Sequence, residues 1–332
     1  MRRSKIAGYG FYVPEKVVTN FDLEKIMDTT NDWIIERTGI EERHFVDKDF
    51  TGPSDLAVQA CQDALKDAGK TVEDVDFIIF ATLSPDYSFP GSSAFLQPKL
   101  GIKDVGAMDI RNQCTGFIYG LSVADQFVKT GMYNCILVVG AEVHSTGMDL
   151  STEGRDVAVL FGDGAGAAVI TPAENDTEGI LSTVLHANGA YAKELWTENP
   201  ASCRMPRISK SMIDEGSIYP VMNGRAVFKH AITKFPNVIL ESLEKAGKSL
   251  SDVDLVIPHQ ANMRITEAVR HRLKLPEEKV FSNIQKYGNT TAASIPIAMT
   301  EARDQGLIKK GSLVSIAAFG SGFTWAGAII QF

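Results

Sequence analysis

The chain has 332 residues, of which 44% are hydrophobic and 22% are charged. These values are typical of globular proteins and exclude a mainly disordered or fibrous chain. Its 33 lysines and arginines are outnumbered by 41 aspartates and glutamates, and the net charge of −8 argues against nucleic acid as the principal partner, because phosphate binding requires a surplus of cations. At roughly 150 residues per domain, this length predicts two domains.

The N-terminal residues predict neither a secretion signal nor a membrane anchor. Residues 1–5 are basic, but glycine and proline interrupt the segment that follows, so it holds no apolar signal core. The longest apolar runs, 77–83 and 136–141, are far shorter than the ~20 residues that a transmembrane helix needs. We therefore expect a cytoplasmic protein that does not interact with a membrane.

An internal repeat organises the sequence. Residues 65–80 and 243–258 are identical at eight of sixteen positions, at a constant offset of 178. Both copies end a helical pattern at Ala-Gly-Lys, where glycine supplies a left-handed C-cap, and continue through Asp-Val-Asp into an apolar run typical of a strand. The offset is about half the chain and far too long for a solenoid repeat, so it predicts two similar halves, residues 1–175 and 176–332.

Helical and strand patterns alternate along both halves. Amphipathic helical patterns cover residues 54–68, 116–130, 227–246, 263–273 and 292–305. Between them lie apolar, strand-like runs, and in each half a glycine-rich turn leads into one further strand. This alternation predicts an α/β protein with mostly parallel sheets, to which the glycine-linked strands add antiparallel neighbours. Two such halves packed together give five layers, α/β/α/β/α, with a shared site where the halves meet.

Cys114 is the candidate nucleophile. It follows a predicted strand and precedes a helical pattern, and its flanks are polar and contain glycine. The free N–H groups and the positive dipole end at a helix start lower a thiol pKa and favour the thiolate. Cys61 in a helix and Cys135 at the start of a strand are expected to be structural, which is also the alternative for Cys114, and Cys203 is expected in an exposed loop. With no C-x-x-C pair, neither a metal site nor a disulfide is predicted.

Two polar residues of the second half complete the candidate site. His259 stands at the terminus of a predicted strand, and Asn289 has the position of an N-cap for helix 292–305. This helix start lies at the repeat offset from the one at Cys114, so pseudo-symmetry brings the two helix starts towards each other. We therefore expect Cys114, His259 and Asn289 in one cleft. The alternative is that His259 and Asn289 only cap the helices that follow them.

The glycine-rich turns differ in their expected roles. The turn at Gly162, Gly164 and Gly166 lacks G-x-G-x-x-G spacing and leads into a strand rather than a helix, so it predicts no nucleotide phosphate site. The turn at residues 320–322 is instead placed to present a backbone N–H group to a developing oxyanion.

Five segments together resemble the β-ketoacyl-[acyl-carrier-protein] synthase III family, thiolase-fold enzymes that start bacterial fatty acid synthesis. They are residues 29–40, the segment around Cys114, and residues 259–262, 288–296 and 319–325, in the family's order. The resemblance runs from about residue 5 to the C-terminus. It implies a thiolase-like fold of five layers, α/β/α/β/α, built from two pseudo-symmetric halves.

The resemblance also implies a decarboxylating Claisen condensation. Cys114 would attack an acyl-CoA thioester and hold the starter acyl group, with the backbone N–H groups of Cys114 and Ser321 as the oxyanion hole. Malonyl-acyl-carrier-protein would then lose CO₂, and the enolate would attack the acyl-cysteine. His259 and Asn289 would donate hydrogen bonds to the malonyl thioester oxygen, and Phe319 matches the family's phenylalanine beside this pair. No metal and no cofactor besides the thioester substrates is implied.

Further matches to the family imply three binding regions. The residues expected to bind coenzyme A are Thr29, Trp33, Arg37, Arg155 and Asn262, with Trp33 and Arg155 enclosing the adenine. Lys229 and Arg264 match family positions associated with carrier-protein and phosphate contact. Arg270 and Arg272 are also expected to bind the acyl carrier protein, because together with Arg264 and Lys274 they concentrate positive charge just after His259. The residues expected at the acyl pocket are Phe89 and His144. Phe89 matches a residue that lines the pocket of the neighbouring subunit, which implies a homodimer.

The sequence departs from the family's pattern near the nucleophile and the acyl pocket. Asn112 and Gln113 stand where small apolar residues are commoner, Ser321 replaces the usual glycine, and Arg225 stands where asparagine is frequent. His144 is unusually polar for its region. These departures bear on the starter acyl group and leave the core mechanism unchanged.

Three other interpretations remain open. A polyketide synthase of the same fold uses the same cysteine, histidine and asparagine, but it would extend its product repeatedly from malonyl-CoA. A cysteine hydrolase can also place Cys, His and Asn in this order, although the C-G-S-C-W pattern is absent and the two-fold repeat does not belong to that fold. A non-catalytic interaction protein is the third, and it would keep its cellular function after Cys114→Ala.

Overall fold

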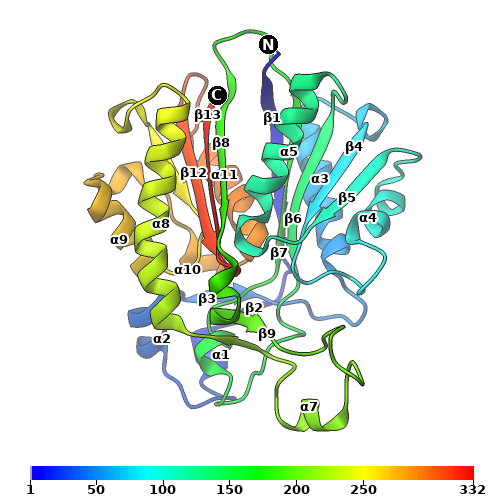
Figure 1. The fold of residues 1–332 in the computed structure, drawn as a ribbon, viewed down its shortest axis with the longest axis vertical. Coiled ribbons are helices and arrows are strands. Elements are labelled where there is room, and N and C mark those ends of the chain that lie inside the picture. The colour runs from blue at the N-terminus through cyan, green and yellow to red at the C-terminus, as the bar shows by residue number, and fades with distance from the viewer. Residues whose placement is uncertain (1) are drawn as a thin grey trace.

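Two central β-sheets form the frame of the molecule, which a computed structural model describes over residues 2–332 (Figure 1). The strands of the first sheet, in order across it, are β1 (Ser4–Tyr12), β7 (Gly164–Pro172), β6 (Ile136–Glu142), β4 (Phe77–Ala81) and β5 (Gly106–Ile110). Those of the second are β8 (Gly179–Ala187), β13 (Thr324–Gln331), β12 (Leu313–Gly320) and β11 (Leu255–Pro258). The boundary predicted at residue 175 falls in the connection between β7 and β8.

Parallel pairing is confined to part of each sheet. β4 is parallel to both β5 and β6, and β11 is parallel to β12. The glycine-linked strands β7 and β13 are antiparallel to their neighbours, as the sequence predicts. The prediction of mostly parallel sheets is wrong, because two of the four pairings in the first sheet and two of the three in the second are antiparallel.

Helices cover both sheets and fill the space between them, which confirms the five layers. The outer helices are α3 (Pro53–Asp67) and α4 (Ser92–Leu100) on the first sheet, and α8 (Gly224–Lys245) and α9 (Met263–Leu273) on the second. The middle layer is formed by α5 (Gly116–Thr130) and α11 (Ser294–Asp304). Five of these six helices lie within a few residues of their predicted positions, and α4 was not predicted from the sequence.

Short elements complete the fold. They are the helices α1 (Asn20–Leu23), α2 (Asn31–Thr38), α6 (Arg155–Ala158), α7 (Lys210–Asp214) and α10 (Ile284–Tyr287), and the strands β2 (Val17–Thr19), β3 (Glu42–His44), β9 (Leu195–Thr197) and β10 (Pro220–Met222). Several of them, including α1, α2, α7, β2 and β9, lie at the lower end of the two sheets in Figure 1. Within residues 2–332, no helix combines the length and apolar character that crossing a membrane requires.

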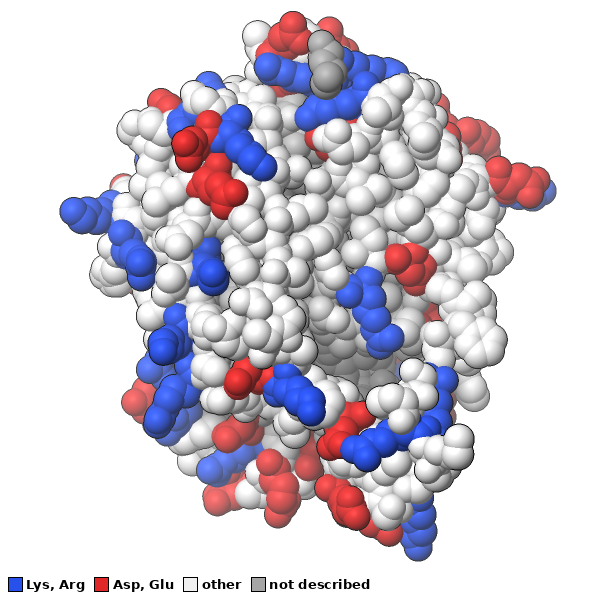
Figure 2. Space-filling view, viewed as in Figure 1, with Lys and Arg blue, Asp and Glu red and all other residues white. Residues whose placement is uncertain are grey.

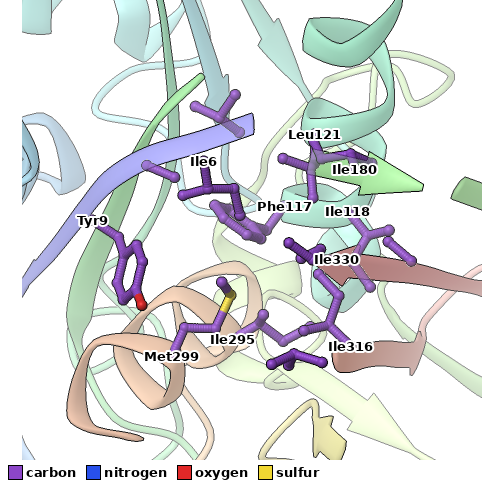
Figure 3. Close-up of a cluster of buried hydrophobic side chains, with 14 of the residues drawn as sticks. Ile6, Tyr9, Phe117, Ile118, Leu121, Ile180, Ile295, Met299, Ile316 and Ile330 are labelled. Carbon is purple, nitrogen blue, oxygen red and sulfur yellow. The ribbon is translucent and has the colours of Figure 1, made fainter. Parts of the chain in front are cut away.

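The middle layer packs against both sheets through one apolar cluster (Figure 3). Phe117 and Leu121 lie one turn apart on α5, and Met299 of α11 lies near Ile6 of β1 and Ile316 of β12 in the same cluster. Burial of each such side chain contributes about 1.5–3 kcal/mol to folding, so this cluster holds the two halves together.

The repeat is visible in local geometry as well as in sequence. The short 3₁₀ helices η1 (Val72–Asp74) and η4 (Leu250–Asp252) each begin at a hydroxyl residue whose backbone N–H donates to the aspartate three residues on. The glycines that end the preceding helices, Gly69 and Gly247, have φ angles of 60° and 65°. The two copies therefore fold alike at the positions that the repeat predicts.

Candidate active site

Cys114 lies in a tight turn between β5 and α5. The preceding residue, Gln113, has a φ of 42°, and a short 3₁₀ turn, η2 (Gln113–Thr115), leads directly into α5. The cysteine is only 6% exposed. At the end of β12, a Cβ atom added to Gly320 would lie 2.7 Å from the Cys114 sulfur, so glycine is needed there to let the backbone reach the thiol.

Two backbone N–H groups lie close enough to the Cys114 sulfur to affect its pKa. Those of Cys114 and Ser321 both act to lower the pKa of the thiol. Burial and, next, the charge of Glu142 act more strongly in the other direction, and together they raise the pKa of the Cys114 thiol to about 12. The expectation of a lowered thiol pKa is therefore wrong, because the loss of water around the sulfur outweighs the N–H groups at the helix start.

Glu142 is a buried carboxylate that sequence reasoning missed. It ends β6 and accepts hydrogen bonds from the Thr82 hydroxyl, the Leu83 and Ser84 N–H groups and the Ser84 hydroxyl, the last at 2.6 Å. Burial raises its pKa to about 7 in spite of these donors. A glutamate at the end of an otherwise apolar strand was the only signal in the sequence. Its carboxylate fixes the segment after β4 and places negative charge near the thiol.

Removal of this charge is expected to make Cys114 more reactive. At pH 9 Glu142 is ionised and raises the thiol pKa, so Glu142→Gln should lower that pKa and increase the thiolate fraction. The rate of Cys114 alkylation by iodoacetamide at pH 9 measures the change. Glu241→Gln, which removes a half-exposed carboxylate paired with His186, is the matched control and should leave the rate unchanged. An equal rate in Glu142→Gln and the wild type contradicts this role of Glu142.

His259 follows the last residue of β11, as predicted, and its ring is fixed from one side. Its Nδ1 lies 2.6 Å from the Ser294 hydroxyl oxygen, which also accepts the Gln260 N–H at 3.4 Å. If the serine hydroxyl donates its proton to Nδ1, the ring proton resides on Nε2. Burial lowers the pKa of His259 to about 3, so the ring is neutral. Its Nε2 is buried and, within residues 2–332, has no hydrogen-bond partner.

Asn289 is held by its backbone and by its side-chain oxygen. Its N–H donates to the Leu160 carbonyl at 2.8 Å, and its carbonyl accepts the Gly162 N–H at 3.2 Å. Its Oδ1 accepts the N–H of Thr291 at 2.9 Å. The prediction that Asn289 is the N-cap of the helix is therefore wrong: Asn289 precedes the 3₁₀ turn η6 (Thr291–Ala293), whose N-cap is Thr290, and the N-cap of α11 is Ala293. The fixed oxygen leaves the Nδ2 donors of the carboxamide available.

The two halves contribute matching turns to the site. Thr291 has a φ of 50°, like Gln113 at the equivalent position of the other half, and η6 leads into α11 as η2 leads into α5. The two turns touch, since a Cβ added to Gly116 would lie 3.6 Å from the Cβ of Ala292. The pseudo-symmetry argument thus correctly predicts that the segments of Cys114 and Asn289 meet.

A cavity of ≈ 330 Å³ opens beside these turns. Cys114, Ser321, His144, Thr291 and Phe161 are among the residues that border it. His259 and Asn289 do not border this cavity. Asn289 contacts two residues that do, Thr291 through its side-chain oxygen and Phe161 through a backbone bridge. Phe319 is buried at the end of β12, with its ring 4.8 Å from that of Phe323.

The residues assigned to the acyl pocket differ in placement. His144 is buried at the cavity wall, with Nε2 2.7 Å from the Thr291 hydroxyl and its ring 4.7 Å from that of Phe161. Burial lowers the pKa of His144 to about 3. Phe89 is 82% exposed in the connection between β4 and α4 and does not border the cavity of its own chain.

The residues assigned to coenzyme A cluster around Trp33 of α2. The Arg37 and Arg155 guanidinium carbons lie 4.6 Å and 5.1 Å from the centroid of its ring. Thr29 has a buried hydroxyl without a partner among the described residues. Both polar groups of the Asn262 side chain make hydrogen bonds: Nδ2 donates to the Arg37 carbonyl at 2.9 Å, and Oδ1 accepts the Arg264 N–H at 2.8 Å.

The residues assigned to the carrier protein lie on α8 and α9, where Figure 2 shows lysine and arginine side chains gathered along one side of the molecule. Lys229, Arg264 and Arg272 are exposed. Arg270 is different, because Glu267 pairs with it at 2.6 Å and offsets its charge. Within residues 2–332, no group of three or more His, Cys, Asp or Glu side chains could hold a metal ion.

The chain is similar to known proteins in sequence and in structure. The family model described as 3-oxoacyl-[acyl-carrier-protein] synthase III matches residues 108–189, and the model of its C-terminal part matches residues 243–332. The chain is 47% identical to the β-ketoacyl-[acyl-carrier-protein] synthase III of Caldanaerobacter subterraneus over 98% of this chain and 97% of that one, and 48% identical to that of Geobacillus kaustophilus with the same coverage.

Solved structures agree with the sequence comparison. The crystal structure of 3-oxoacyl-[acyl-carrier-protein] synthase III from Aquifex aeolicus is similar with a TM-score of 0.91 and 44% identity, over 99% of this chain and 100% of that chain. The priming β-ketosynthase of the R1128 polyketide pathway is similar with a TM-score of 0.90 and 31% identity, over 99% and 96%.

Proposed function

The chain belongs to the 3-oxoacyl-[acyl-carrier-protein] synthase III family of condensing enzymes, and from this premise we propose that it joins an acyl-CoA starter to malonyl-acyl-carrier-protein and so initiates fatty acid synthesis. The reaction releases CO₂ and coenzyme A and gives 3-oxoacyl-acyl-carrier-protein. The observation that carries the proposal is that the turn bearing the buried Cys114 meets the turn that follows Asn289, while His259 is a neutral histidine whose buried Nε2 has no partner among residues 2–332.

The first half-reaction transfers the starter to Cys114. The sulfur attacks the acyl-CoA carbonyl, and the N–H groups of Cys114 and Ser321 stabilise the negative charge on the tetrahedral oxygen. The bond to the coenzyme A sulfur breaks, and the thiol proton leaves with coenzyme A. The product thioester carries no charge on sulfur, so burial and Glu142, which oppose the thiolate, do not oppose the acyl-enzyme.

The second half-reaction uses His259 and Asn289. Loss of CO₂ from the malonyl group leaves an electron pair that is delocalised onto the thioester oxygen, where His259 Nε2–H and an Asn289 Nδ2–H donate hydrogen bonds. Both donors are neutral, so they stabilise the enolate without protonating its carbon. That carbon attacks the acyl-cysteine carbonyl, the Cys114 sulfur leaves as a thiolate, and it takes up one proton from the solvent. No cofactor besides the thioester substrates takes part.

Coenzyme A binds through Trp33 and its two arginines. The adenine stacks on the indole face, with Arg155 moving from its present contact at 5.1 Å to cover the other face, and Arg37 reaches a phosphate. Thr29 offers its unpartnered hydroxyl to the base. Asn262 supports this region from α9 through the Arg37 carbonyl.

Loss of the indole face is expected to weaken acyl-CoA binding. Stacking on an aromatic ring is worth roughly 1–3 kcal/mol per base, so Trp33→Ala should raise the KM for acetyl-CoA by about tenfold or more while leaving kcat little changed. The control is an acetyl thioester of N-acetylcysteamine, which lacks the nucleotide and should react equally with both proteins. Equal loss with both thioesters would show that Trp33 serves the fold rather than the nucleotide.

The acyl carrier protein docks on the cationic surface of α8 and α9. Lys229, Arg264 and Arg272 offer charge to an acidic carrier and lie on the helix that follows His259 or on its neighbour α8. Arg270 contributes less, because Glu267 already pairs with it. Both thioester substrates are soluble, in agreement with the predicted cytoplasmic location.

A second copy of the chain completes the enzyme. β5 is the edge strand of the first sheet, and the nearby loop exposes Tyr87 and Phe89, at 57% and 82%. Unpaired edges and exposed aromatic rings are typical of surfaces that another chain covers. We expect light scattering to give the mass of two chains, and a monomer at micromolar concentration would contradict the homodimer.

Product analysis tests the proposed function against its alternatives. With acetyl-CoA and malonyl-acyl-carrier-protein, the expected product is the 3-oxobutyryl thioester of the carrier protein after one condensation. The similarity to a priming β-ketosynthase keeps a polyketide role as the second candidate. Repeated extension from malonyl-CoA would support that role, and hydrolysis of the acyl thioester faster than condensation would support a hydrolase.

A further inference from the structure

The cavity next to Cys114 is bordered by polar groups that no step of the condensation uses. Of its residues, His144 is 8% exposed, and Gln113 directly precedes the nucleophile. Arg111 borders the same cavity from an exposed position and donates to the Leu83 carbonyl at 3.2 Å. An acyl chain held on the Cys114 sulfur would enter this space, and it would meet His144 and Gln113 first among these three polar groups.

One ring nitrogen of His144 makes a hydrogen bond, and the other has no partner among residues 2–332. Its Nε2 lies 2.7 Å from the Thr291 hydroxyl, and its backbone N–H donates to Asp163 Oδ1 at 2.7 Å, so the ring is held in place. Nδ1 makes no hydrogen bond within the described part of the chain. Burial keeps the ring neutral, with its pKa lowered to about 3. A neutral imidazole nitrogen can donate to or accept from a neutral partner.

Gln113 also combines a fixed backbone with an unpartnered side chain. Its backbone is fixed by the turn into α5, with φ of 42°, while its carboxamide has no hydrogen-bond partner among residues 2–332. A plain alkyl chain in the cavity would cover these polar groups and leave them unpaired, which is unfavourable. An acyl chain with its own hydroxyl or carbonyl group would give them a hydrogen-bonding partner.

We propose that the acyl pocket selects starters that carry a neutral hydrogen-bonding substituent, such as a hydroxyl or an oxo group, and that His144 Nδ1 is the specificity-determining group, assisted by Gln113. This inference rests on the proposed function, because it concerns the acyl group that Cys114 receives. Sites built to hydrogen-bond a substrate reject the analogue that lacks the polar group far more strongly than apolar pockets reject an added hydroxyl.

The test compares matched starters on the whole enzyme. Intact-mass kinetics of Cys114 acylation give kcat/KM for butyryl-CoA and for both enantiomers of 3-hydroxybutyryl-CoA. We expect at least one hydroxy enantiomer to load about tenfold faster, or more, than butyryl-CoA. If butyryl-CoA loads as fast or faster, the inference is overturned while the proposed function stands. If none of these thioesters, nor acetyl-CoA, acylates Cys114, the proposed function itself fails.

Three variants of His144 separate recognition from support of the fold. His144→Asn keeps a polar atom near the position of Nδ1, His144→Gln keeps one near Nε2, and His144→Leu keeps neither. Because the inference assigns recognition to Nδ1, only His144→Asn should retain the preference for the hydroxy starter. His144→Gln preserves the contact to Thr291 and should load both starters alike. Retention of the preference in His144→Gln or His144→Leu would overturn the assignment.

Discussion

His259→Ala and Asn289→Ala variants are expected to accept the starter at close to the normal rate but to lose condensation. The reason is that the first half-reaction relies on the Cys114 and Ser321 N–H groups, whereas only the second requires donors to the enolate oxygen. Loss of one donor should lower the condensation rate by about 10²–10³-fold. Single-turnover experiments that follow acyl-enzyme formation and its discharge by malonyl-acyl-carrier-protein separate the two steps.

The variant Asn289→Asp tests the role of the Nδ2 donor alone. It keeps the shape of the side chain and an oxygen for the Thr291 N–H, but it replaces the Nδ2 donor by a second, negatively charged oxygen. Discharge of the acyl-enzyme should therefore be at least as slow as in Asn289→Ala. A variant of either residue in which acylation fails to the same extent as discharge would assign that residue to the first half-reaction instead.

The second large effect is expected from Cys114→Ala. Without the sulfur no acyl-enzyme can form, and condensation should fall by roughly 10⁴-fold or more. The decarboxylation donors remain, so slow release of CO₂ from malonyl-acyl-carrier-protein is expected to persist. Intact-mass analysis and product assays on the same sample measure both outcomes.

The matched control for Cys114→Ala is Cys203→Ala. Cys203 is exposed, whereas Cys61 and Cys135 are buried like the nucleophile. Cys203→Ala should leave the acyl adduct and the condensation rate unchanged. An adduct of the same mass in Cys114→Ala, mapped to another cysteine, would remove Cys114 from the mechanism.

The fold could be predicted from the sequence largely because of the repeat. The copies at residues 65–80 and 243–258 predict two halves, and helix 116–130 coincides with α5 (Gly116–Thr130). The antiparallel majority of the second sheet could not be predicted, because strand patterns do not specify which neighbour a strand pairs with. Pairing depends on how the halves close around the middle helices, which is a property of the whole chain.

For the site, the sequence predicts which residues take part better than it predicts their pKa values and protonation. A cysteine before a helix predicts an acidic thiol, but the structure buries Cys114 beside Glu142, and the pKa rises instead. The sequence singles out His259, but its tautomer depends on Ser294, thirty-five residues further along the chain. Such effects arise from contacts between distant segments and from the loss of water, neither of which a linear pattern records.

The central claim is that Cys114 is an acyl carrier discharged with the help of His259 and Asn289, and time-resolved intact-mass analysis of the wild-type enzyme tests it most directly. The predicted result with a panel of acyl-CoAs is a single adduct of acyl mass, located on Cys114 by peptide mapping, that disappears when malonyl-acyl-carrier-protein is added and reappears as 3-oxoacyl-carrier-protein. An unmodified Cys114 with every starter, or an adduct that malonyl-acyl-carrier-protein does not discharge, would contradict the claim.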